Sequence, residues 1–263
     1  MNPARIIKDR AYRHWLMVWL KNRFRTRYKA GRLKAFRYEL EVTDPLSVAY
    51  QFRDIFVEQE YKLANSGHKP VIVDVGANVG VSVLYFCDTL DEPEIHAFEA
   101  DPTVFKKLKR NVECYAPRAN VHLVNAAAYI ANGTIGFACD GADGGQISHL
   151  TNEQSSYNVP SIDLLDFLLG FEKIALLKID IEGAEALVVP HCVPAFDRIE
   201  RIFIEYHSSP DQAQSIVRIL SVLQASGFRL HLQSADFVRS PFAPVKPGRF
   251  DNQVNIFAYR QPT

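Results

Sequence analysis

The sequence predicts a doubly wound α/β fold with a mostly parallel sheet, a C-terminal antiparallel strand pair and an N-terminal helical extension. Two observations carry this prediction. Short apolar, β-branched runs alternate with helix-compatible segments, which is the order that βαβ units produce. The runs are almost continuously apolar, as in strands that helices cover on both faces. With 263 residues, 48% of them hydrophobic, the chain can bury one sizeable core.

The first half of the chain is expected to hold a leading helix and three strands with helices between them. In the leading helix, Leu46, Ala49 and Phe52 recur near a 3.6-residue period. The second strand closes on Asp101 and Pro102, an N-cap residue followed by a proline at the first helical position. The expected elements are a helix in residues 44–63, a strand in 70–80, a helix in 81–90, a strand in 94–102, a helix in 103–115 and a strand in 120–129.

The second half is expected to complete the sheet. Ser161 is a suitable N-cap for one helix, and Gly227 is expected to stop another. The fourth strand, Ile174–Ile179, is a buried run that leads directly into carboxylates. The expected elements are a strand and loop in residues 133–150, a helix in 161–170, the fourth strand, a short helix at Glu185–Val189, a fifth strand in 198–207, a helix in 209–228 and a final antiparallel pair in 229–235 and 252–260.

Residues 1–44 are expected to form a basic, aromatic-containing arm, and residues 45–263 a single cofactor-binding catalytic domain. Residues 1–37 carry twelve Lys and Arg against Asp9 alone, a net charge of +11, which leaves −11 for the rest of the chain. This asymmetry suggests an anionic partner at residues 5–37. The aromatic residues among the charges include Trp15, Trp19, Phe24 and Tyr28. An anionic membrane surface and RNA are two alternatives, and a helix packed on the acidic body is the simplest one.

Hydropathy and cysteine usage bear on the compartment. The longest apolar run of the arm, Trp15–Leu20, has six residues, whereas a spanning helix needs roughly twenty. The run is also too short for a secretory signal, and charged residues lie close to it on both sides. The cysteines, Cys87, Cys114, Cys139 and Cys192, are scattered and form no C-x-x-C pair. We therefore expect a soluble cytoplasmic protein with reduced thiols, compatible with peripheral binding at a membrane surface.

The first candidate site is the loop "DVGANVG", Asp74–Gly80, because ligands of such sheets bind beyond the carboxyl ends of the strands. Gly76 allows a sharp turn, and Gly80 lets the next helix lie close. A nicotinamide fingerprint has G-x-G-x-x-G, whereas Asn78 stands where a pyrophosphate would need close backbone approach. The loop therefore favours a ligand with a small carboxylate over a dinucleotide and argues against a dehydrogenase.

Glu99 ends the second strand, nineteen residues after Gly80. An ionised carboxylate only accepts hydrogen bonds and can take both hydroxyls of a ribose. Together, the loop and Glu99 indicate a ribonucleoside whose other end is an amino acid, and S-adenosylmethionine fits this description.

Three stretches of the sequence resemble the FkbM-type S-adenosylmethionine-dependent methyltransferases. They are "VIVDVGANVGVSVLYF", "HAFEADP" and "LLKIDIEGAEALVV", in this order, and the D-x-E-G-x-E element of the third is the most specific. The resemblance covers about residues 45–260 and leaves the arm outside it. It implies a Rossmann-like fold and O-methylation of a hydroxyl on a sugar, a glycan or a polyketide-like secondary metabolite. Its cofactor residues would be Asp74, Gly76, Ala77, Asn78, Gly80 and Glu99, with Asp180 near the reacting centre.

One departure from the methyltransferase pattern concerns the adenine. Many methyltransferases place an acid after the third strand to hold the adenine amine, but this chain has "VNAAAY" there. Asn125, or the backbone at Asn125 and Ala126, must then serve.

The fourth and fifth strands are expected to deliver the catalytic groups. The fourth ends in Asp180 and Glu182, and the fifth in Glu205 and His207. Methyl transfer is an in-line displacement, in which the enzyme positions the acceptor oxygen and removes its proton. We expect His207 to be the base because an imidazole with a pKa of about 6.5 is neutral near pH 7. Glu182 and Glu185 are equally compatible with a role at a helix N-terminus.

Several alternatives stay open. Asp180, Glu205 and His207 could bind Mg²⁺, although no metal is expected. A nucleic-acid methyltransferase using the arm is a rival, but the chain has "DIEG" where base-amino methylation uses an N/D-P-P-Y/F-type turn. A non-catalytic nucleotide-binding protein would not need the acids of the fourth and fifth strands. His149 lies in a segment that we expect to be a solvated loop.

Overall fold

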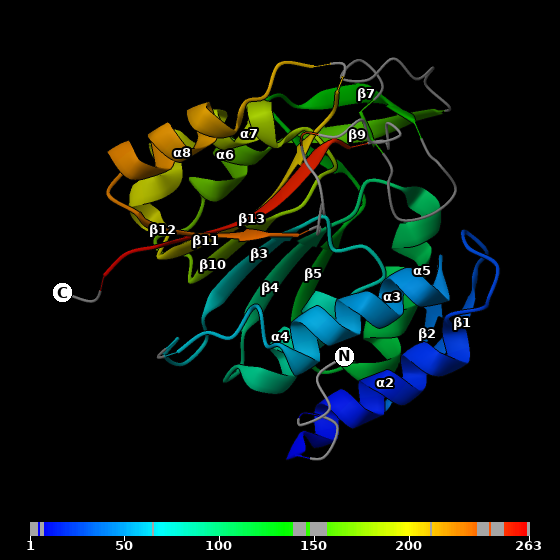
Figure 1. Ribbon diagram of the computed structural model, residues 1–263. Helices are drawn as coiled ribbons and strands as arrows, with labels where there is room; N and C mark the ends of the chain where they lie inside the picture. Colours follow the sequence, from blue (N-terminus) through cyan, green and yellow to red (C-terminus); the bar gives the residue numbers. More distant parts are fainter. Residues whose placement is uncertain are drawn as a thin grey trace. The chain divides into compact units, whose positions relative to one another are not determined.

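A computed structural model describes residues 5, 8–64, 66–138, 146–147, 157–210, 212–235, 242 and 250–261 (Figure 1). His149 and most of its predicted loop lie outside these residues. The described residues belong to two compact units. Unit 1 lies within Met1–Pro70 and Ala77–Asn125, and unit 2 within Val71–Gly76, Ala126–Ala138 and Gln146–Thr263. Among the described helices, none combines the length and the apolar character that crossing a membrane requires.

The larger sheet has seven strands. They are β3 (Val71–Val75), β4 (Glu94–Phe98), β5 (Asn120–Val124), β10 (Leu176–Ile179), β11 (Arg201–Ser208), β12 (Arg229–Ser234) and β13 (Asn252–Tyr259). Their order is β12-β13-β11-β10-β3-β4-β5. β10 is parallel to β3 and β11, and β4 is parallel to β5. β13 lies between β11 and β12 and is antiparallel to both. The predicted mostly parallel sheet with a C-terminal antiparallel pair is confirmed.

Unit 1 contains the helices predicted for the first half of the chain. They are α2 (Arg10–Asn22), α3 (Pro45–Phe52), α4 (Val81–Thr89) and α5 (Pro102–Tyr115). Asp101 caps α5 as predicted, because its side chain accepts from the backbone N–H of Thr103 and Val104. The helix predicted in residues 44–63 is shorter than expected, because α3 ends at Phe52. Beyond α3 it becomes a π-helical turn, Arg53–Val57, and Gln59 then adopts a left-handed φ of 56°.

The basic arm contains a hairpin as well as a helix. β1 (Gly31–Ala35) pairs antiparallel with β2 (Tyr38–Val42) through a turn at Phe36, which has a φ of 53°. Along both strands buried and more accessible residues alternate. The sequence does carry this signal, because charged residues separate the apolar ones with a period of two.

Unit 2 contains a second, four-stranded sheet with the order β6-β9-β7-β8. Its strands are β6 (Ala127–Tyr129), β7 (Gly133–Ala138), β8 (Gln146–Ile147) and β9 (Tyr157–Asp163). The strand predicted in residues 120–129 is therefore two strands, β5 and β6, in different sheets. The predicted cap at Ser161 is wrong, since this residue lies in β9 and its hydroxyl donates to the carbonyl of Ala131 at 3.0 Å. Asp163 caps α6 (Leu164–Leu168) instead, accepting from the N–H of Leu165 at 2.9 Å.

The remaining helices of unit 2 cover its part of the larger sheet. α7 (Glu185–His191) packs against α8 (Ile216–Ala225) and β11, and α8 also contacts β12. Figure 1 shows α6, α7 and α8 together on one side of β10 to β13. A 3₁₀ turn, Val193–Arg198, links α7 to the following strand. Gly227 has a φ of 82° just after α8, so the predicted helix stop is confirmed.

Candidate active site

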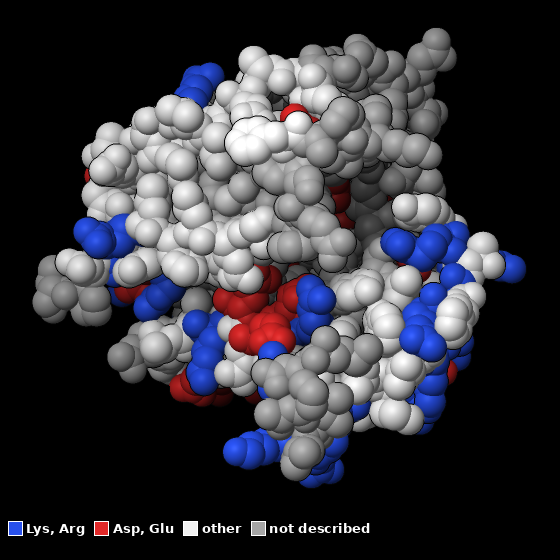
Figure 2. Space-filling model, in the orientation of Figure 1, with Lys and Arg blue, Asp and Glu red and all other residues white. Residues whose placement is uncertain are grey.

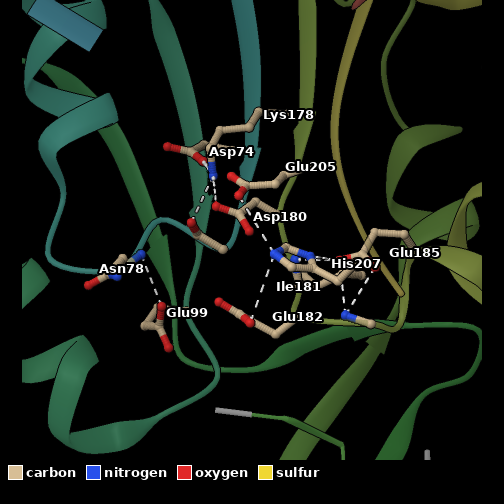
Figure 3. A network of polar contacts seen from close by, with 12 residues as sticks. Asp74, Asn78, Glu99, Lys178, Asp180, Ile181, Glu182, Glu185, Glu205 and His207 are labelled. Carbon is tan, nitrogen blue, oxygen red and sulfur yellow. Dashed lines mark hydrogen bonds and ion pairs between the residues drawn. The ribbon is translucent and has the colours of Figure 1, made fainter. Parts of the chain in front are cut away.

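Lys178 lies at the centre of a buried charge cluster in unit 2 (Figure 3). Its side chain is 4% exposed, and its Nζ lies 3.2 Å from Asp74 Oδ1 and 3.6 Å from Asp180 Oδ2. Nζ also donates to the backbone carbonyl of Gly76 at 2.9 Å. Burial by itself would lower the pKa of Lys178, but the charges of Asp74 and Asp180 raise it above its usual value. One protonated amine therefore holds the ends of β3 and β10 and the glycine turn together.

Gly76, just after β3, lies very close to the backbone of Asp180, just after β10. A Cβ at this position would lie 1.8 Å from the carbonyl oxygen of Asp180, and the φ of Gly76 is +84°. The contact is fixed by the neighbouring ladder, in which Asp180 N donates to Val75 O at 3.0 Å. Glycine is therefore required both by space and by backbone conformation.

Replacing Gly76 with alanine is expected to lower the free energy of unfolding by roughly 2–5 kcal/mol, combining left-handed strain with overpacking. Gly67→Ala is the matched control, because Gly67 has a φ of +73° but no described atom within 4 Å of a Cβ. It should cost roughly 1–2 kcal/mol for strain alone. Urea unfolding of both variants measures the difference. Equal losses would show that the approach of Asp180 is not tight.

His207, on β11, lies among three carboxylates of unit 2. Its Nδ1 is 3.3 Å from Glu185 Oε1, and its Nε2 is 3.7 Å from Glu205 Oε1 and 3.9 Å from Glu182 Oε2. The side chains of His207 and Glu185 are almost completely buried, whereas those of Glu182 and Glu205 are about a quarter exposed, at 23% and 27%. Figure 3 shows these groups converging at the ends of β10 and β11. Two partly exposed carboxylates thus lie near Nε2 of a buried imidazole, whose Nδ1 faces the buried Glu185.

Glu185 fixes the loop that follows β10. From the first turn of α7 its carboxylate accepts hydrogen bonds from the N–H of Ile181 and of Gly183, each at 3.0 Å. The loop turns through left-handed residues, with a φ of 55° at Glu182 and 111° at Gly183. Glu185 therefore orients both the loop carboxylate of Glu182 and the ring of His207.

The electrostatics of the cluster do not support a neutral His207. Burial by itself would lower its pKa, but the carboxylates of Glu185, Glu182 and Asp180 raise it to about 10. The imidazole is therefore protonated at neutral pH. The sequence could not reveal this, because the buried partner Glu185 comes from a different element.

Glu205 has the pKa that suits proton transfer near neutrality. Burial raises the pKa of Glu205 to about 8, and the negative charges of Asp180 and Glu182 act in the same direction. The positive charges of His207 and Lys178 oppose this rise. Glu205 can consequently gain and lose a proton close to physiological pH.

In unit 1, Glu99 organises the segment that follows the glycine turn. Its Oε2 accepts from the N–H of Asn78 at 3.0 Å, and its Oε1 accepts from the N–H of Asp101 at 2.9 Å. Asn78 has a left-handed φ of 49°, and the preceding N–H, of Ala77, donates to the carbonyl of Phe98 at 2.9 Å. Glu99 therefore holds the backbone in place both at Asn78 and at Asp101.

Gly80 and Asn125 complete the unit 1 group. Gly80 is the N-cap of α4 with a φ of 94°, and a Cβ there would lie 2.8 Å from Leu108 Cδ1 of α5. Because glycine has no side chain, Gly80 cannot cap the helix with one. The backbone N–H groups at such a helix start favour an anion. Asn125 Nδ2 donates to the carbonyls of Glu99 at 2.8 Å and Ala100 at 3.2 Å. Only its Oδ1, an acceptor, is then suited to an adenine amine.

The geometry also bears on the metal alternative. In this part of unit 2, the ligand atoms that lie within 4.8 Å of one another belong to Asp180, Glu182 and His207, whereas the sequence suggested Glu205 in place of Glu182. A second such group, Glu94, His96 and His122, lies in unit 1. A protonated imidazole cannot bind a metal, so binding would require His207 to lose its proton.

Lys178 was missing from the sequence prediction, and Glu185 was predicted only in a role at a helix N-terminus. Lys178 interrupts an apolar strand, and a charged residue within such a run is a signal that it has a buried partner. Glu185 follows Glu182 by three residues, and its burial depends on the fold of the loop. The sequence contains the first signal but not the second.

Known proteins are similar to this chain at low identity. "Methyltransferase sdnD" of Sordaria araneosa is 22% identical, with 83% of this chain and 96% of the relative covered. "31-O-demethyl-FK506 methyltransferase FkbM" of Streptomyces tacrolimicus is 25% identical, with 68% and 81% covered. "2-O-methyltransferase NoeI" of Sinorhizobium fredii is 27% identical, with 52% and 63% covered.

A solved structure and a family model agree with these relatives. The S-adenosylmethionine-dependent methyltransferase from Agrobacterium tumefaciens has a TM-score of 0.50 at 10% identity, over 91% of this chain and 72% of that one, which is a likeness of fold. The model of the methyltransferase FkbM domain matches residues 74–230, more than half of the chain. This protein therefore belongs to the FkbM-type family of S-adenosylmethionine-dependent methyltransferases.

Proposed function

We propose that this protein transfers a methyl group from S-adenosylmethionine to a hydroxyl oxygen of a sugar, a glycan or a secondary metabolite. The observation that carries the proposal is the position of the Glu205 carboxylate, which is partly exposed at the end of β11 and lies 3.7 Å from the buried ring of His207. The pKa of Glu205, which burial raises to about 8, suits removal of a hydroxyl proton. The names of two relatives, a 2-O-methyltransferase and a 31-O-demethyl-FK506 methyltransferase, support an oxygen acceptor.

The residues present suit the cofactor. We assign Glu99 to the ribose hydroxyls, because its carboxylate only accepts hydrogen bonds. The start of α4 at Gly80 suits the methionine carboxylate. Asp180 and Glu182 suit the cationic end of the cofactor. We assign Asp74 a positioning role instead of direct contact, since it is completely buried against Lys178.

In this mechanism the protein positions the acceptor and receives one proton. S-adenosylmethionine supplies an electrophilic methyl group on a sulfonium. Glu205, in its ionised form, accepts the hydroxyl proton as the acceptor oxygen bonds to the methyl carbon and the carbon–sulfur bond breaks. His207, protonated and held by Glu185, orients Glu205 from 3.7 Å and offsets the negative charge of its neighbours.

Replacing Glu99 with glutamine is expected to weaken binding of S-adenosylhomocysteine by roughly 10–100-fold, the loss of one hydrogen bond to a charged group. Glu113→Gln is the control, since Glu113 is exposed on α5 in the same unit. Calorimetric titration of the three folded proteins measures the effect. No binding by the wild type, or equal binding by the Glu99 variant, would refute the cofactor assignment.

The acceptor class is tested by product analysis. The enzyme is incubated with isotope-labelled S-adenosylmethionine and a panel of sugars, glycans and hydroxylated metabolites, and the labelled carbon is located by NMR. We expect an O-methyl signal. Label found only on nitrogen or carbon would contradict the proposal even if the cofactor binds.

A further inference from the structure

Helix α2 is anchored to unit 1 through one face. Tyr12, Trp15 and Val18 are buried there. Trp15 Nε1 donates to the backbone carbonyl of Ala49 at 2.8 Å, and Trp19 Nε1 donates to the hydroxyl of Tyr50 at 2.9 Å. The tryptophans of the basic arm therefore hold the helix in place and leave its opposite face outward.

The outward face carries large apolar side chains. Met17 is 56% exposed, Leu20 38% and Phe24, just beyond the helix, 84%. Their spacing of three and four residues puts them on one side of the helix. Tyr28 follows at 61%. Exposing such side chains to water is unfavourable, so a cluster of them indicates a contact surface.

Positive charge surrounds these side chains. Arg10, Arg13 and Lys21 share the outward face, because they lie at helical spacing from Met17. Residues 8–34 hold ten Lys and Arg against one acid, Asp9. The Asp9 carboxylate pairs with Arg5 at 3.2 Å and also caps α2. Figure 2 shows Lys and Arg gathered on the side where α2 and β1 lie in Figure 1.

We propose that this face, which we call the α2 face (Arg10, Arg13, Met17, Leu20, Lys21 and Phe24), docks onto an anionic lipid bilayer. Basic side chains at a bilayer surface interact with acidic headgroups, while apolar ones between them enter the boundary with the acyl chains. A nucleic acid fits less well. Phosphate groups make no favourable contact with the aliphatic side chains of Met17 and Leu20. The guanidinium of Arg23 already covers the Phe24 ring, 4.4 Å from its centroid, where a base would otherwise stack.

The test is co-sedimentation of the full chain with vesicles of phosphatidylcholine alone and of phosphatidylcholine with about 30% phosphatidylserine. We expect binding to the anionic vesicles only, weakening as salt is raised. Two triple variants should each reduce the partition coefficient by at least about tenfold. They are Arg10→Gln/Arg13→Gln/Lys21→Gln, which removes charge, and Met17→Ser/Leu20→Ser/Phe24→Ser, which removes apolar contact.

The control is Lys106→Gln/Lys109→Gln/Arg110→Gln, which removes the same charge from exposed positions on α5. It should bind vesicles like the wild type. Circular dichroism establishes that each variant is folded. No sedimentation of the wild type with anionic vesicles would overturn the proposal. The proposal would also be overturned if the serine variant bound anionic vesicles as strongly as the wild type. The same holds if the wild type bound homopolymeric RNA but not vesicles.

Discussion

Replacing Lys178 with methionine is expected to lower the free energy of unfolding by about 3–5 kcal/mol, which is the usual cost of breaking a buried ion pair from one side. Methionine keeps most of the side-chain volume but removes the charge. Asp74, which is completely buried, and Asp180 would then lose the ammonium that lies 3.2 and 3.6 Å away. The glycine turn would also lose the hydrogen bond to its carbonyl at Gly76.

The matched control is Lys173→Met. Lys173 forms an ion pair with Glu200 at 2.6 Å, but its side chain is 71% exposed. Such surface pairs contribute about 0–1 kcal/mol. Urea unfolding of both variants at one pH gives the comparison. Equal stability losses would mean that the carboxylates around Lys178 are satisfied without it.

Replacing Glu205 with glutamine is expected to lower kcat by roughly 10²–10⁴-fold while leaving S-adenosylhomocysteine binding intact, because the change removes a base and keeps the shape. Glu200→Gln, just before the start of β11 at Arg201, serves as control and should keep activity. If His207 were the base instead, His207→Gln would abolish turnover and Glu205→Gln would retain it. The pair of variants therefore decides between the two residues.

The pH dependence of the wild type is an independent test of the same assignment. A base must be ionised to act, so activity should rise with pH and level off above the pKa of Glu205, which is about 8. A neutral histidine would instead give a plateau above about 6.5. The profile is measured as kcat/KM for the acceptor at saturating cofactor.

The larger sheet could be predicted from the sequence because strands that are buried on both faces consist largely of apolar residues. β3, β10 and β11 are mostly buried strands of four to eight residues, rich in Ile, Leu, Val and Phe, with helical periods between them. No such compositional signal marks the boundary between β5 and β6. The chain is apolar on both sides of Asn125. Asn125 donates to the carbonyls of Glu99 and Ala100, and a sequence pattern does not identify these partners.

The topology of the sheet predicted which residues lie together at the site. It did not predict their protonation states. Parallel strands end at one edge, so Asp180 and His207 were expected near each other. The pKa of His207 is raised chiefly because Glu185, buried and folded back from α7, lies 3.3 Å from it. Such pKa shifts depend on burial and on distances of a few ångströms, and a sequence pattern defines neither.

The position of β13 sets a condition on when the site can form during synthesis. Glu205 and His207 lie opposite Asn255 and Gln253 in the ladder between β11 and β13. Until residues 252–259 leave the ribosome, β11 lacks this neighbour and presents an open edge that can pair with other chains. The two residues that we propose for methyl transfer are thus among the last to be held in place, and a nascent or clipped chain without β13 has the glycine loop but lacks the strand that pairs with β11.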